Sequence, residues 1–285
     1  MIDFVWLTLI KATPVIYAAL GGVLSERSGV INIGLEGMIA IGAFTGVCVS
    51  YATGNAQAGA AAGVLAGALL GALLGIAATR FRVEQIVAGT GINLIALGGA
   101  AYGLVVVFGQ PGASKQVAAL GTGGETAMVV AALVLAVLLH LFLFRTRGGL
   151  HVRACGENPR AAEVAGIDPL RVRLWATATG GAFAALGGVF LAMAELDLYS
   201  DGMSAGRGFI ALAAVIFGRW NPLGATGAAL FFGAFSALQY TLQRSGIPSE
   251  LMQALPYVAA LVALAGFAGR ARAPAADGIP YVPVR

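Results

Sequence analysis

The sequence predicts an all-α protein that crosses a membrane several times. Of its 285 residues, 59% are hydrophobic and 11% are charged, and the mean hydropathy is +0.86. A soluble core cannot hold that much apolar sequence, whereas each helix that spans a bilayer needs about 20 apolar residues. Windows of this length predict about nine spans, within a range of about eight to ten, at residues 4–24, 30–51, 57–79, 86–108, 126–144, 174–194, 205–220, 222–243 and 250–268.

Arginines predict the orientation of these spans. The longest polar segment, residues 145–173, carries Arg145, Arg147, Arg153, Arg160, Arg171 and Arg173 against three acids. Short arginine-rich loops remain in the cytoplasm, so alternation places the N-terminus outside and the C-terminus inside. The predicted organisation is a transmembrane domain over residues 1–269, which includes the cytoplasmic loop 145–173, and a cytoplasmic tail over residues 270–285. The net charge of +4 forms no continuous patch and does not indicate nucleic-acid binding.

The first two spans contain polar residues in apolar surroundings. Pro14 predicts a kink, and Lys11 either reaches the outer interface or takes part in an ion relay. Asn32 and Glu36 lie four residues apart, on one face of the predicted second helix. Because an acid that faces lipid is costly, we expect both side chains to face the interior, either as a tie to another helix or as part of a pathway.

The third and fourth spans carry signals of helix association. Glycines recur at every fourth residue of the third span: Gly59, Gly63, Gly67, Gly71 and Gly75. Such a stripe lets another helix approach closely, from within the chain or from a sister subunit. In the fourth span, Asn93 is expected to bond to a neighbouring helix or to line a pathway.

The segment 205–221 is expected to form a short, broken span. Glycines lie at both of its ends, Pro222 follows it, and Phe209 stands at its head. Irregular backbone at membrane depth is tolerated where it lines a cavity. Three prolines after residue 270 predict a non-helical tail.

The cytoplasmic loop contains the signals of one short helix. Asn158 is a good N-cap, Pro159 suits the first helical position, and Gly166 suits the stop. A helix of about 10 Å is too short to be stable alone, so it needs a packing partner. The loop is therefore either an ordinary connection whose arginines set the orientation or a docking element for another protein.

A family resemblance favours docking. The loop reads GENPRAAEVAGI at residues 156–167, which resembles the cytoplasmic coupling segment of permease subunits in ABC importers of the branched-chain amino acid, simple-sugar and nucleoside group. The resemblance extends over nearly the whole chain through SERSGVINIGLEG at 25–37, GRGFIALAAVIFGRWNPLG at 206–224 and LPY at 255–257, and is strongest to the shorter permease of nucleoside importers. It implies that the segment docks on an ATPase through Gly156, Glu157, Asn158, Pro159, Ala162 and Gly166.

The resemblance also implies a bacterial cytoplasmic membrane location, a sister permease, an ABC ATPase and a solute-binding lipoprotein outside, besides membrane lipids. If the solute is a nucleoside, the side chains of Asn32, Glu36 and Asn93 would bond its ribose and Phe209 would contact its base. A ribose-type sugar permease is the alternative, and a self-contained carrier or channel is a further one.

Several chemistries are set aside by their missing motifs. No glycine-rich phosphate loop with a lysine occurs, so ATP and Mg²⁺ are expected on the partner ATPase and this chain is not expected to be an enzyme. Its two cysteines and two histidines lack metal-ligand spacing. A G-x-S-x-G match at 202–206 is expected on the outer side, away from both histidines, which argues against a serine hydrolase.

Overall fold

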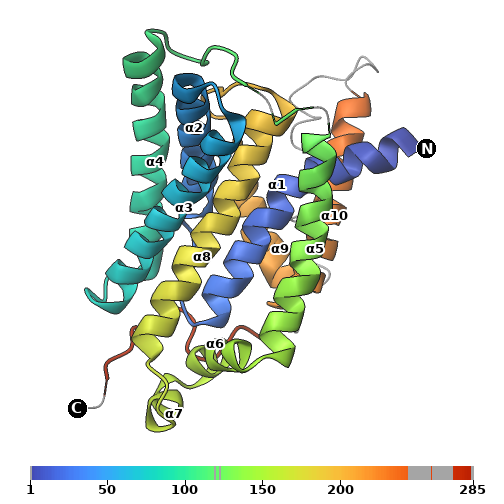
Figure 1. Cartoon of the computed structure of the whole chain (residues 1–285). Coiled ribbons are helices and arrows are strands. Elements are labelled where there is room, and N and C mark those ends of the chain that lie inside the picture. Colours follow the sequence, from blue (N-terminus) through green and yellow to red (C-terminus); the bar gives the residue numbers. More distant parts are fainter. Residues whose placement is uncertain (1, 119, 122, 243–257, 259–271, 284–285) are drawn as a thin grey trace.

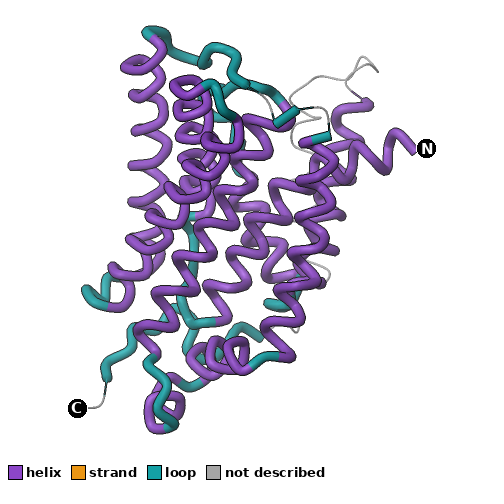
Figure 2. The backbone as a smooth tube through the Cα atoms, in the orientation of Figure 1, coloured by secondary structure: helices purple, strands orange, loops and turns teal. Residues whose placement is uncertain are grey.

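The structure is a computed structural model that describes residues 2–118, 120–121, 123–242, 258 and 272–283. The described part is helical, and its only β-type pairing is an isolated bridge between Ala113 and Ser200 (Figure 2). Its elements are α1 (Ile2–Arg27), α2 (Leu35–Thr53), α3 (Ala56–Thr79), α4 (Gln85–Phe108), α5 (Gly124–Arg145), α6 (Arg147–Glu157), α7 (Pro159–Val164), α8 (Pro169–Phe190), the π-helical turn η1 (Leu191–Glu195), α9 (Arg207–Phe217) and α10 (Pro222–Leu242).

Within the described residues, six helices are long and apolar enough to cross a membrane: α1 to α5, and α8 continued by η1. The expected short span at 205–220 is the 11-residue helix α9. Helix α10 covers most of the expected span 222–243 but is not one of the six, and the expected span 250–268 lies outside the described residues. The all-helical membrane class therefore holds, while the count of about nine stays a prediction.

The two ends of the bundle differ in structure (Figure 1). Helices α6 and α7 lie at one end together with the described C-terminal residues, and the N-terminus lies at the other. The opposite end carries the described residues of the connections 109–123 and 196–206, which are joined by backbone hydrogen bonds such as Ser114 N–H to the Tyr199 carbonyl at 2.8 Å. The polar loop predicted to face the cytoplasm thus occupies one end of the molecule.

The glycine stripe of α3 lies inside the chain, where α3 crosses α2 and α8. All five of its glycines are buried. A Cβ atom added at Gly63 would lie 2.4 Å from the carbonyl oxygen of Gly42, and one at Gly71 would lie 2.2 Å from that of Thr177. These distances are shorter than any side chain allows, so the three backbones can approach only because the residues are glycine.

Replacing Gly71 by alanine should therefore destabilise the chain, by about 1–3 kcal/mol or more, since the added carbon meets backbone that cannot yield. The measurement is the thermal unfolding midpoint of the purified protein in detergent. Gly98→Ala in α4 is the matched control, because nothing lies within 4 Å of the atom that it adds. Equal midpoints for the two variants would contradict the packing given to α3.

Candidate functional site

The stretches 25–37 and 206–224, far apart in sequence, contact each other at two places. At the first, the Glu36 carboxylate at the start of α2 accepts the backbone N–H groups of Gly206 at 2.8 Å and Gly208 at 2.7 Å. These groups lie at the N-cap and in the first turn of α9, where a helix has unpaired N–H donors and a partial positive charge. Glu36 is only 4% exposed, so a residue of α2 provides the anionic cap of α9 in the interior.

The second contact joins the end of α1 to the turn after α9. The Arg27 side chain donates to the Trp220 carbonyl at 2.6 Å, and the Trp220 indole N–H donates to the Glu26 carboxylate at 2.5 Å. Arg219 and Trp220 have φ angles of 54° and 53°, a conformation that side chains other than glycine rarely adopt. The bonds from α1 therefore hold a strained turn in place.

Asparagines complete the packing around the segment between α1 and α2. Asn93 of α4 accepts the Gly37 N–H at 2.7 Å and donates to the Ile33 carbonyl at 2.9 Å. Asn32 is fully buried and donates to the Ser25 hydroxyl at 3.3 Å, while its Oδ1 atom has no hydrogen-bond partner. Three of the four predicted pathway residues, Asn32, Glu36 and Asn93, therefore gather around residues 25–37.

Phe209, the fourth, is separate from this cluster. Its side chain is 51% exposed at the start of α9, whereas the other three are buried. Glu36 and Asn93 were expected either to bond to another helix or to line a pathway. The hydrogen bonds described above are bonds of the first kind. Whether these residues also line a pathway stays a prediction.

The segment predicted to be cytoplasmic forms α7 with the start and stop signals that its sequence indicates. The Asn158 side chain accepts the Ala161 N–H at 3.0 Å, Pro159 opens the helix, and Gly166 follows it with a φ of 82°. The left-handed conformation at Gly166 is the one that glycine adopts without strain. The prediction of a single helix in this segment was wrong, however, because α6 precedes α7.

Helix α6 depends on its surroundings. Thr146 caps it by accepting the Gly149 N–H at 3.1 Å, but three glycines and a low overall hydrophobicity concealed the helix in the sequence. Gly156 near its end is pinned against α1, because an added Cβ would lie 2.2 Å from the Arg27 carbonyl oxygen. Gly156 and Glu157 therefore belong to α6, one helix before the one predicted for docking.

Within α7, burial distinguishes two faces. Ala162 is only 3% exposed, so it packs within the chain and supports α7 from inside. Val164 is 89% exposed, although it is apolar, and α7 projects from the end of the bundle in Figure 1. The exposed surface of α7 thus includes Val164, which sequence reasoning did not select.

Sequence reasoning also missed the role of Arg173, which it counted only as a cytoplasmic charge. The guanidinium is 1% exposed and donates to the carbonyls of Ser28 at 3.1 Å, Ala276 at 3.2 Å and Ile279 at 2.9 Å. A fork of several donors fits such an arrangement of carbonyls. The only signal in the sequence was the position of Arg173, directly before an apolar span. An arginine that served only to set the orientation would extend into water, whereas Arg173 is buried.

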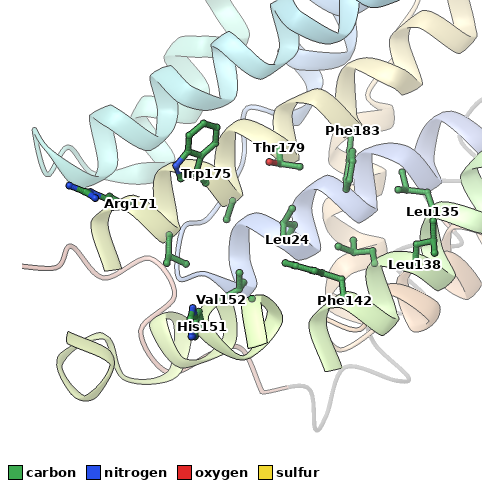
Figure 3. A pocket seen from close by; sticks show the side chains of 14 residues that line it. Leu24, Leu135, Leu138, Phe142, His151, Val152, Arg171, Trp175, Thr179 and Phe183 are labelled. Carbon is green, nitrogen blue, oxygen red and sulfur yellow. The ribbon is translucent and has the colours of Figure 1, made fainter. Parts of the chain in front are cut away.

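A mostly apolar pocket of about 590 Å³ lies between α1, α5, α6 and α8 (Figure 3). Leu24 of α1 lies in the centre of the view, with Phe142 of α5 on one side, Trp175 of α8 on the other and His151 of α6 below. None of the four predicted pathway residues lines it. The pocket and the polar junction around Glu36 are thus separate features of the chain.

These observations define a multi-pass helical membrane protein whose buried polar groups hold helix ends together and whose short helix α7 projects from one end. Comparison with known proteins identifies the family to which this membrane protein belongs. The chain belongs to the family of permease components of branched-chain amino acid transport systems, which matches residues 5–269.

Individual relatives cover almost the same length. The guanosine ABC transporter permease protein NupQ of Bacillus subtilis is 39% identical, over 96% of this chain and 95% of its own. The nucleoside ABC transporter permease protein NupC of Lactococcus lactis is 36% identical over the same shares. A putative glucose ABC transporter permease of Haloferax volcanii is 33% identical, over 83% of this chain and 76% of its own. No solved structure matches the chain.

Proposed function

We propose that this chain is one transmembrane subunit of an ATP-driven importer of nucleosides in the bacterial cytoplasmic membrane. The observation that carries the proposal is the similarity, over nearly the full length, to permeases of guanosine and nucleoside transporters. A second permease of the same description is also similar to this chain in each organism: NupP in Bacillus subtilis and NupB in Lactococcus lactis. A sister permease is therefore proposed as its partner in the membrane.

The proposal assigns ATP hydrolysis and Mg²⁺ to a separate ABC ATPase, which docks at α7. The described spans contain few charged residues, and Glu36 is already engaged at the start of α9, which leaves little for an ion-coupled carrier. A lipid-anchored binding protein would deliver the solute at the opposite end, where connections 109–123 and 196–206 lie.

The test of this function is uptake of labelled guanosine, adenosine and uridine by cells that express this chain together with the sister permease, the ATPase and the binding protein. We expect saturable uptake of at least one nucleoside, competed by other nucleosides and not by free ribose at equal concentration. Uptake that ribose blocks while unlabelled nucleosides leave it unchanged would replace the proposal with a sugar permease.

Orientation is tested by labelling single cysteines with a membrane-impermeant maleimide. Val164→Cys should react only after the membrane is opened, and Gln110→Cys, in the exposed connection after α4, should react in intact cells. The native Cys155 cannot report this, because it is fully buried and burial raises the pKa of its thiol to about 11. The reverse labelling pattern would place α7 outside and remove the ATPase contact.

A further inference from the structure

The described C-terminal residues 274–283, which we call the C-terminal brace, pack along the coupling segment instead of extending into water. The Ala276 N–H donates to the Gly156 carbonyl at 2.8 Å, and the Ala275 N–H donates to the Glu157 carboxylate at 3.3 Å. Further along, the Tyr281 hydroxyl donates to the Glu163 carboxylate. One short stretch of chain therefore bonds to the end of α6 and to α7.

The brace is also attached to the membrane helices. Arg173 of α8 donates to the carbonyls of Ala276 and Ile279 and, through its third bond, to Ser28 between α1 and α2. Gly278 turns the chain with a φ of 76°, and an added Cβ there would lie 2.7 Å from the Ile31 side chain. Both Ala276 and Tyr281 are buried, at 7% and 5% exposed.

Helix α7 needs such an attachment. It has six residues, fewer than an isolated helix requires for stability, and its exposed end carries Val164. A docking helix that moved freely against its own chain would absorb a displacement imposed by the ATPase without passing it on. The brace links α7 to Arg173, and Arg173 in turn bonds to Ser28 in the segment 25–37. In the same segment, Glu36 binds the start of α9 and Arg27 binds the turn after its end.

We propose that the C-terminal brace is a positioning element of the coupling apparatus, which fixes α7 to the α1–α2 segment so that movement of the ATPase reaches α9. This inference rests on the proposed function, since it assumes that α7 contacts an ATPase. Tyr281 is the positioning residue that acts through Glu163, and Arg173 is the one that joins the brace to the membrane helices.

The experiment uses the whole complex, with both permeases and the ATPase in liposomes, and measures guanosine imported per ATP hydrolysed. Tyr281→Ala should lower this ratio at least about tenfold, the scale of one lost hydrogen bond to a charged group. The same variant should keep basal ATP hydrolysis and co-purification with the ATPase. Val282→Ala, the adjacent residue and 51% exposed, is the matched control and should leave the ratio unchanged.

A double-mutant cycle separates positioning from general packing. Tyr281→Phe keeps the ring and removes only the hydroxyl, so combining it with Glu163→Ala should lower the ratio no further than the more severe single variant. Fully additive losses, loss of ATPase binding in Tyr281→Ala, or a normal ratio in that variant would each overturn the proposal. A wild-type complex that imports no nucleoside would instead refute the proposed function, and the two failures are thereby distinguished.

The labelling rate of Cys155 tests the brace without a transport assay. Cys155 directly precedes Gly156, whose carbonyl accepts the Ala276 N–H. In a Cys48→Ala background, Cys155 should react with maleimide at least about tenfold faster in Tyr281→Ala than in the parent or in Val282→Ala, because releasing the brace uncovers the end of α6. Equal rates in all three proteins would show that the brace does not hold this region.

Discussion

Replacing Val164 by aspartate should abolish nucleoside uptake while the permease still folds and reaches the membrane. Val164 is 89% exposed on α7, so the substitution disturbs no packing within the chain. If this face enters an apolar groove of the ATPase, the charge would be buried without a partner there. Disruption of an interface hot spot costs about 2 kcal/mol or more, so a loss of about 30-fold or greater is expected if Val164 lies at the centre of the contact.

The measurement is guanosine uptake together with guanosine-stimulated ATP hydrolysis in the reconstituted complex. Val83→Asp is the control, because Val83 is also partly exposed but lies in the α3–α4 turn. Ala162→Arg is a poorer test, since Ala162 is buried within the chain and its replacement would also disturb folding. Normal transport by Val164→Asp would return the segment to an ordinary loop between spans.

The second large effect is expected at Glu36. Glu36→Ala would leave the N–H groups of Gly206 and Gly208 unpaired in the interior, at about 1–3 kcal/mol each. We expect a lower thermal midpoint and at least about a tenfold loss of uptake. Glu36→Gln retains one acceptor oxygen and should lie between the alanine variant and the wild type.

Glu84 offers a control of matched chemistry. Its carboxylate accepts the N–H groups of Ile86 at 3.1 Å and Val87 at 2.8 Å at the start of α4, but it is exposed. Water can replace that cap, so Glu84→Ala should cost less than Glu36→Ala. An unchanged midpoint in Glu36→Ala, with an altered apparent affinity for guanosine, would show that Glu36 acts on the solute and not on α9.

The sequence by itself determined the features that depend on neighbours within a few residues. Runs of apolar residues located the six described spans, since the length of a spanning helix is set by bilayer thickness. Asn158 and Gly166 marked the start and stop of α7, because capping and left-handed turns are local chemistry. The spacing of glycines in α3 likewise predicted close helix approach, although not that the partners would be α2 and α8.

Only the tertiary structure decided which distant groups meet. Glu36 bonds to a backbone N–H 170 residues away, and Arg173 bonds to a carbonyl 103 residues away. The spacing of residues in the sequence cannot predict such a pair. A buried glutamate or arginine has the same sequence neighbours whichever distant group it binds. Helix α6 was missed for a related reason, since a helix this short depends on packing and α6 packs against α1, α5 and α8, which are distant from it or separated by turns. The C-terminal residues were expected to form a non-helical cytoplasmic tail because of their prolines. Extended backbone nevertheless retains donors and acceptors, and the structure pairs several of them with Gly156 of α6 and with the Arg173 side chain of α8.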